Sequence, residues 1–186
     1  MTQQHITYNN PAFIHPSALL YGKVIINEGA SVWPNVVIRS EAYEVEIGEK
    51  SNIQDFVMIH VGYKSGTKIG RFSTIAHHCT LHGCKIGDYC LIGINSTIMD
   101  DCMIGNNCVV LGHTFLKQGT VIPDNSVVAG VPGKVIKTLN NYKSNEFNAL
   151  LYYMNAIEYS KGNYRAWSDL KAIETFINKE LHSYSQ

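Results

Sequence analysis

Residues 86–128 read IGDYCLIGINSTIMDDCMIGNNCVVLGHTFLKQGTVIPDNSVV, and an aliphatic residue stands at every sixth position of this stretch. The eight aliphatic markers are Ile86, Ile92, Ile98, Ile104, Val110, Leu116, Ile122 and Val128. An amphipathic helix would repeat every 3.6 residues and an ordinary strand every two. A period of six therefore predicts short strands separated by turns, each placing its marker toward a narrow core.

The same six-residue period organises the chain before residue 86. Earlier markers form three shorter runs: Ile14, Leu20, Ile26, Val32 and Ile38; Ile47, Ile53 and Ile59; Ile69, Ile75 and Leu81. Small or β-branched residues often stand two places before a marker, as Ala30, Ser73 and Ser126 do. Nineteen such repeats are typical of a hexapeptide β-helix, in which three repeats make one coil of about 18 residues. We expect a mainly β protein of about six parallel coils.

The period ends after Val128, at the segment AGVPGK, and the remaining residues have helical spacing. Apolar side chains predict one helix from about Ser144 to Tyr159, capped by its serine, and a second helix from Ser168. The expected domains are therefore a β-helix over residues 1–138 and a helical segment over residues 139–186. Because one hexapeptide cannot bury its own apolar face, we expect the helices to cover an end or a side of the stack.

Charge and hydropathy exclude several classes of partner. The 15 basic and 15 acidic residues cancel and are mixed along the chain, so no basic stripe predicts binding to nucleic acid or to an anionic membrane. The chain has no run of 18 apolar residues, and the first residues, MTQQHITYNNPAF, are not those of an export signal. We expect a cytoplasmic protein whose five cysteines are reduced.

Four of the cysteines follow a marker by four places, the position that small core residues occupy in other repeats. They are Cys79, Cys90, Cys102 and Cys108. Because a free cysteine behaves as a small buried hydrophobe, these four are expected in the core. Cys84 lies in the shortened step between Leu81 and Ile86, where the period assigns no direction.

Two histidines are expected to lie one above the other on the outside of the stack. His60 and His82 each follow a marker by one place, which alternation along a strand turns outward. They are 22 residues apart, and removing a four-residue loop near Gly62–Thr67 leaves one full coil of 18. Their separation should then be the strand spacing of about 4.8 Å, which suits two imidazoles that bind one ion.

His77 lies at a corner, so far along the chain from His82 that sharing one ion within a single molecule is awkward; a neighbouring copy is the alternative source. Three neutral imidazoles with an open fourth position are typical of catalytic metal sites. Such an ion lowers the pKa of its water toward about 7 and supplies hydroxide, which indicates hydration or hydrolysis chemistry. The other histidines, His5, His15, His78 and His113, fit no such stack and are expected to be solvated surface residues.

Four segments together resemble the gamma-class carbonic anhydrases and their bacterial relatives. They are VVIRSE at 36–41, SNIQD at 51–55, IH at 59–60 and TIAHHCTLHGC at 74–84. The resemblance implies a left-handed β-helix that forms a homotrimer, with Zn, or alternatively Fe or Co, bound between subunits. It makes His60 and His82 ligands from one chain and His77 the ligand from its neighbour. The implied activity is reversible hydration of carbon dioxide to bicarbonate.

The same resemblance implies roles for six further residues. Gln54, which is expected to point outward as His60 does, would orient the metal-bound water or bicarbonate, and Arg39 and Asp55 match the charged pair of the interface. Asn52 matches the motif asparagine, although turn formation would equally explain Asn52 and Asp55. Glu41 replaces the usual aspartate, and Tyr152 corresponds to a tyrosine of the C-terminal helix. Ala42 and Tyr63 stand where the family has acidic proton shuttles, which predicts a weak or buffer-dependent rate.

Two other functions fit the repeats. Many hexapeptide proteins transfer acyl groups from coenzyme A, and their catalytic histidine would here be His113. A noncatalytic trimeric scaffold that binds metal for assembly is the third possibility, since a fold does not determine a function. Metal analysis together with assays of carbon dioxide hydration and acetyl transfer distinguishes the three.

Overall fold

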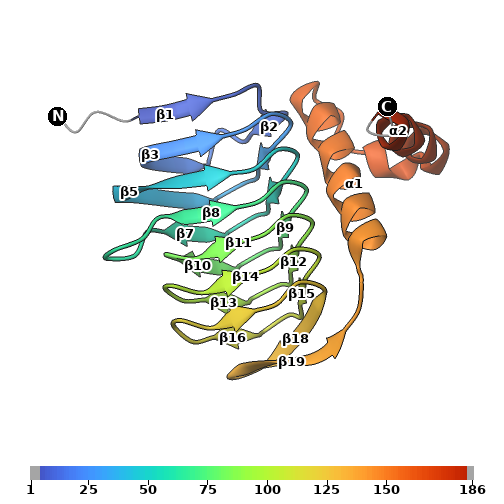
Figure 1. Ribbon diagram of the computed structural model, residues 1–186. Coiled ribbons are helices and arrows are strands. Elements are labelled where there is room, and N and C mark those ends of the chain that lie inside the picture. Colours follow the sequence, from blue (N-terminus) through green and yellow to red (C-terminus); the bar gives the residue numbers. More distant parts are fainter. Residues whose placement is uncertain (1–4, 184–186) are drawn as a thin grey trace.

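The computed structural model describes residues 5–183 and shows a left-handed β-helix with two helices along one side (Figure 1). One face of the stack contains parts of β3 (Leu19–Ile26) and β5 (Val37–Ile47), then β7 (Met58–His60), β10 (Thr80–His82), β13 (Thr97–Ile98) and β16 (Phe115–Leu116). The second face contains β1 (His5–Tyr8), the ends of β3 and β5, then β8 (Thr67–Ile69), β11 (Lys85–Ile86), β14 (Met103–Ile104) and β17 (Val121–Ile122). The third face contains β2 (Phe13–Ile14), β4 (Ser31–Val32), β6 (Asn52–Ile53), β9 (Thr74–Ile75), β12 (Leu91–Ile92), β15 (Val109–Val110), β18 (Ser126–Gly130) and the antiparallel β19 (Gly133–Thr138). The hexapeptide prediction is therefore confirmed.

Each marker stacks on the marker of the next coil. On the third face the parallel register places Ile53 against Ile75, Ile75 against Ile92, and Ile92 against Val110. All of these side chains are fully buried. The column of markers is therefore the core of the protein, and the strand spacing of about 4.8 Å sets the vertical distance between its members.

The cysteines complete this core. Cys79, Cys90, Cys102 and Cys108 are buried, as their position in the repeat predicts, and all are free thiols. Cys84, which the period could not place, is also buried. Burial raises the pKa of the Cys79 thiol to about 12.

The turns between strands use a left-handed backbone three residues after most markers. Asn35, Asn95, Asn107 and Asn125 have φ between 58° and 60° there. Asparagine tolerates this conformation better than most residues. His78 and His113 occupy the same turn position and are exposed, and the His78 ring stacks on Phe56 of the neighbouring coil with the ring centroids 4.9 Å apart.

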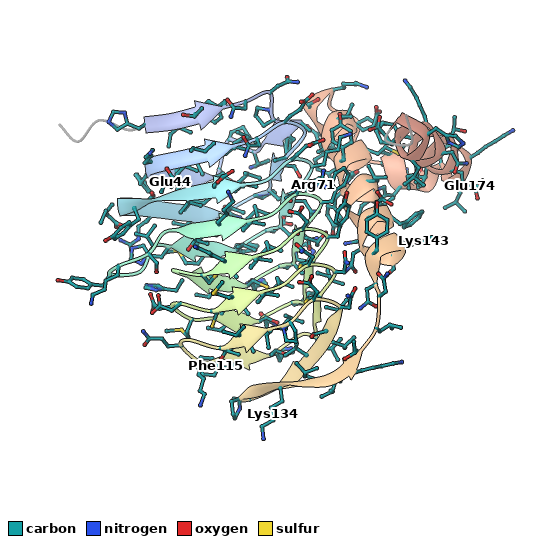
Figure 2. All side chains as sticks on the ribbon, viewed as in Figure 1. Glu44, Arg71, Phe115, Lys134, Lys143 and Glu174 are labelled. Carbon is teal, nitrogen blue, oxygen red and sulfur yellow. The ribbon has the colours of Figure 1, made fainter. Side chains whose placement is uncertain are left out.

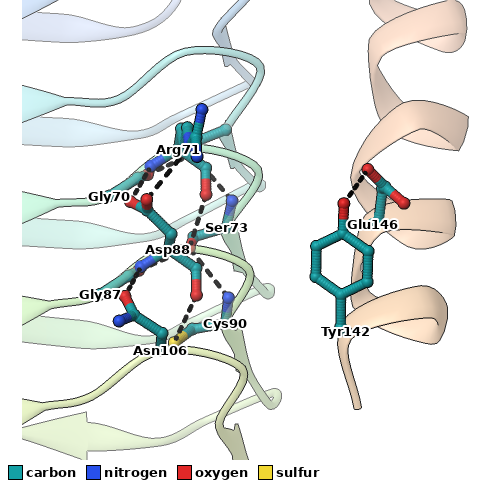
Figure 3. Close-up of polar contacts among 10 residues, drawn as sticks. Gly70, Arg71, Ser73, Gly87, Asp88, Cys90, Asn106, Tyr142 and Glu146 are labelled. Atoms are coloured by element: carbon teal, nitrogen blue, oxygen red, sulfur yellow. Dashed lines mark hydrogen bonds and ion pairs between the residues drawn. The ribbon is translucent and has the colours of Figure 1, made fainter. Parts of the chain in front are cut away.

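Side chains at one corner bind the backbone of the neighbouring coil (Figure 3). The amide of Arg71 donates to Asp88 Oδ1 at 3.0 Å, and the amide of Asp88 donates to Asn106 Oδ1 at 2.8 Å. This corner is closely packed, since a Cβ atom on Gly70 would lie 2.4 Å from Asp88 Oδ1. Glu44 and Glu174 are among the exposed polar side chains (Figure 2).

The C-terminal helices cover a side of the β-helix. α1 (Tyr142–Ser160) packs against β2, β4, β6 and β9 of the third face. A short 3₁₀ turn, η1 (Ala166–Ser168), then leads to α2 (Leu170–Ser183), which packs on α1. Phe72 of the β-helix joins Met154 of α1 and Ile177 of α2 in a second apolar cluster.

The predicted helix starts are corrected by the structure. α1 begins two residues before Ser144, and the Ser144 hydroxyl donates to the carbonyl of Asn141, so the predicted serine cap is wrong. Asn140 Oδ1 instead accepts the amide of Tyr142 at 2.9 Å. α2 begins at Leu170 rather than Ser168, and Asp169 Oδ1 accepts the amide of Ala172. The ends of the two expected domains, residues 1–4 and 184–186, lie outside the described residues, and no helix within residues 5–183 is long and apolar enough to cross a membrane.

Candidate metal centre

His60 and His82 lie at the ends of β7 and β10, one directly over the other. The parallel register pairs these residues, as the corrected coil length predicts, and their ring centroids are 4.8 Å apart. His60 Nδ1 faces His82 Nε2 at 2.9 Å. Both rings point out from the solenoid and are partly exposed, so two imidazole nitrogens converge at an accessible edge.

A carboxylate binds the other nitrogen of each ring. Glu41 Oε2 lies 2.9 Å from His60 Nε2, and Asp100 Oδ1 lies 2.8 Å from His82 Nδ1. Because an ionised carboxylate only accepts hydrogen bonds, each contact takes a ring N–H, and a neutral imidazole has only one. The facing nitrogens, His60 Nδ1 and His82 Nε2, are then both lone-pair acceptors. A positive charge between them, a proton or a metal ion, is needed to make that contact favourable, so this donor set fits a cation.

Glu41 links the histidines to an arginine. Arg39 Nη1 donates to Glu41 Oε1, and Arg39 is in register with His60 on the neighbouring coil. Partial desolvation acts to raise the pKa of Glu41, but hydrogen bonds from its own backbone amide and from His60 outweigh it. The pKa of Glu41 is therefore lowered, which keeps this carboxylate ionised beside His60.

His77 does not join His60 and His82 within one chain. It lies at the corner after β9, where its Nδ1 is 3.1 Å from Asp55 Oδ2. Over residues 5–183, no three or more His, Cys, Asp or Glu side chains are arranged to hold a metal ion. Arg39 and Asp55, which the resemblance pairs, contact Glu41 and His77 respectively.

Asn52, Gln54 and Tyr152 lie on the His77 side of the molecule, near α1. Gln54 Nε2 donates to Asn52 Oδ1 at 3.0 Å, and Asn52 Nδ2 donates to Thr74 at 2.9 Å. Gln54 points away from the solenoid core as expected, but it is only 3% exposed, unlike His60. Burial raises the pKa of Tyr152, and the charge of nearby Asp55 raises it further.

The predicted site residues, together with Asp100, therefore form two separate groups. The first, here called the paired-histidine group, contains His60 and His82 with Arg39, Glu41 and Asp100. The second, the His77 group, contains His77 with Asn52, Gln54, Asp55 and Tyr152. Among the residues that the structure describes, no hydrogen bond or ion pair joins one group to the other.

Asp100 is the residue that inspection of the sequence missed. It lies 18 residues after His82, and a count of one regular coil would place it directly over that histidine. The step from Leu81 to Ile86 is one residue shorter than the usual six, however, so the register pairs Leu81 with Ile98. Asp100 therefore reaches His82 from a corner rather than from the stacked position.

Comparisons with known proteins indicate the family to which this chain belongs. Residues 83–118 match the bacterial transferase hexapeptide family, described as six repeats. A protein of Methanocaldococcus jannaschii described as a "probable carbonic anhydrase" is 43% identical over 75% of this chain and 89% of its own length. The mitochondrial gamma carbonic anhydrase 2 of Arabidopsis thaliana is 32% identical over 69% of this chain, which spans about half (49%) of that relative.

A solved structure from Bacillus cereus, provisionally described as an acetyltransferase, has a TM-score of 0.83 and 29% identity, covering 87% of this chain and 95% of that one. The fold, the repeats and the identity over most of the archaeal relative lead to one conclusion. This chain belongs to the gamma carbonic anhydrase-like family of hexapeptide-repeat proteins.

Proposed function

We propose that this protein is a carbonic anhydrase that reversibly hydrates carbon dioxide to bicarbonate at metal sites shared between the subunits of a homotrimer. The metal would be held by His60 and His82 of one subunit and by His77 of the next. Zn is the expected ion, with Fe or Co as alternatives, because three imidazoles do not choose among these metals. The observation that carries the proposal is the convergence of two imidazole lone pairs, each set by a carboxylate on the far side of its ring.

The separation of the two groups supports a shared site. A contact between different patches on two copies is a head-to-tail contact, and it closes into a ring when the rotation between copies allows it. In a ring of three, each interface would join the paired-histidine group of one copy to the His77 group of the next. Every copy would then contribute to two sites, and each of the three sites would contain three imidazoles.

When bound, the ion supplies Lewis acidity and lowers the pKa of water toward about 7, which provides a nucleophile for carbon dioxide. Glu41 Oε2 accepts the N–H of His60 Nε2, so that the opposite nitrogen, His60 Nδ1, stays free to bind. Asn52 accepts a hydrogen bond from Gln54 Nε2 and so fixes the orientation of that amide. An amide held in this way is suited to orient water or bicarbonate next to His77.

Proton export is expected to limit the rate. Ala42 and Tyr63 carry no carboxylate at the positions where the family has acidic residues. The acidic residues near Ala42 are already paired, Glu44 with Lys23 at 2.7 Å and Glu46 with Lys68 at 2.8 Å. The hydration rate should therefore rise with the concentration of a small diffusible buffer.

Acyl transfer is less well supported by the geometry. A catalytic histidine needs a partner that orients its ring. His113 is an exposed turn residue, and its side chain makes no hydrogen bond or ion pair with the residues that the structure describes. The two stacked histidines, by contrast, each have a carboxylate partner.

The test combines elemental analysis of anaerobically purified protein with its mass in solution and its hydration rate. Bound metal, trimeric mass and hydration are expected for the unchanged protein. His82→Ala should lose metal and hydration together, while the control His113→Ala should keep both. Metal without hydration would favour the noncatalytic scaffold, and acetyl transfer that depends on His113 would favour the transferase. A His82→Ala variant with full metal content would show that the site is wrongly assigned.

A further inference from the structure

Asp100 contacts His82 at the ring nitrogen that does not face His60. Its Oδ1 atom is 2.8 Å from His82 Nδ1, and its side chain is 21% exposed. The carboxylate comes from the turn after β13, one coil away from β10, which carries His82. The contact therefore depends on how the coils stack and not on a local turn.

Two glycines make room for this carboxylate. A Cβ atom at Gly62 would lie 2.2 Å from Asp100 Oδ1, and one at Gly83 would lie 2.6 Å from the same atom. Both distances are too short for any real contact. Glycine at both positions thus allows Asp100 Oδ1 to approach His82.

We propose that Asp100 is a positioning residue that holds His82 in the tautomer with its proton on Nδ1, which leaves the Nε2 lone pair directed toward His60. The consequence of this inference rests on the proposed function, in which the Nε2 atom left free by this tautomer would bind the ion. A neutral imidazole carries one N–H, and a carboxylate at 2.8 Å from Nδ1 favours the tautomer that donates to it. Outer partners of this kind fix the ring orientation and raise the basicity of a histidine ligand.

The adjacent residue provides a matched control. Asp101 carries the same charge, but Gln118 Nε2 donates to its Oδ2 at 3.1 Å and the Ser65 hydroxyl to its Oδ1 at 3.4 Å. Asp101 has no hydrogen bond or ion pair to His82 among the described residues. Asp100→Asn and Asp101→Asn therefore remove the same charge from the same turn, and only the first alters the contact with His82.

The first test observes the ring directly in metal-free protein at alkaline pH, by nitrogen-detected NMR of the histidine side chains. The unchanged protein and Asp101→Asn should show His82 protonated on Nδ1. In Asp100→Asn the amide can donate to Nδ1, so the population should shift toward protonation on Nε2. An unshifted tautomer in Asp100→Asn would overturn the proposal.

The second test measures affinity for Zn²⁺ by competition with a coloured chelator. Asp100→Asn should bind about 10- to 100-fold more weakly, the usual effect of losing such a partner, while Asp101→Asn should be unchanged. Gly62→Ala keeps every charge but places a methyl group against Asp100 Oδ1, and its backbone is outside the left-handed region. It should show the same tautomer shift and the same weakening.

Circular dichroism and solution mass establish that each variant is folded. If Gly62→Ala, folded like the unchanged protein, keeps the original tautomer and affinity, the positioning role is wrong even if Asp100→Asn fails to fold. If the unchanged protein binds neither Zn²⁺, Fe²⁺ nor Co²⁺ while its His82 tautomer still depends on Asp100, the proposed function fails and the positioning role stands. The two failures are therefore distinguishable.

Discussion

Replacing one marker in the middle of the stack should be among the most destabilising single changes. Ile92 is fully buried between Ile75 and Val110. Its carbonyl accepts the amide of Ala76 at 2.9 Å, and the amide of Gly93 donates to the carbonyl of Val110 at 2.7 Å. These bonds hold the neighbouring coils at the strand spacing, so the stack cannot collapse into a space left at Ile92.

Ile92→Ala removes three buried carbon atoms, and substitutions of this kind cost about 2–5 kcal/mol, most where the site cannot relax. We expect the free energy of unfolding to fall by about 4 kcal/mol, which lowers Tm by about 8–16 °C in a chain of this length. Ile92→Val removes a single carbon and should cost about 1 kcal/mol. The assays are thermal and denaturant unfolding at one fixed protein concentration.

Ile136→Ala is the matched control, because Ile136 lies on β19 and is 60% exposed. It should change the free energy of unfolding by no more than about 0.5 kcal/mol. Equal losses in Ile92→Ala and Ile136→Ala would refute the view that the column of markers is the main source of stability.

Two further predictions concern α2 and the core thiols. Glu180 binds the buried Lys50 ammonium at 2.7 Å, so Glu180→Gln should lower the free energy of unfolding by about 2 kcal/mol and speed the hydrogen exchange of the α2 amides. Glu174 is exposed on the same helix, so Glu174→Gln should change neither quantity. Burial raises the pKa of the Cys79 thiol from its usual 9.0 to about 12, so the native state keeps a proton that the unfolded chain loses above about pH 9. The stability that this thiol contributes is full below pH 9 and falls as pH rises toward 12. Denaturant titrations should therefore show that the free energy of unfolding falls less between pH 7 and pH 10.5 in Cys79→Ala than in the unchanged protein. An equal fall in both proteins would contradict the raised pKa of Cys79.

Much of the fold follows from the positions of the aliphatic residues. Because each coil is built from the same short repeat, counting residues between markers also gives the vertical register. That count placed His60 beside His82, since only the loop of four residues had to be removed. It also placed four cysteines in the core, whereas the irregular step near Cys84 left that residue unassigned.

Contacts across corners and between elements required the structure. The sequence contains Asp100 and the two glycines beside it, but not the information that a shifted repeat brings them to His82. It predicts a helix near α1, but the start of that helix and its docking over β6, beside Gln54 and Asn52, depend on packing.

The sequence alone therefore determined the parallel stack, its core and the convergence of two imidazoles, because a fixed period turns distance along the chain into distance in space. Only the tertiary structure decided which carboxylate stands behind each ring and which residues surround the third histidine. Those contacts join residues from different coils, corners and elements, where no period relates position in the chain to position in the fold.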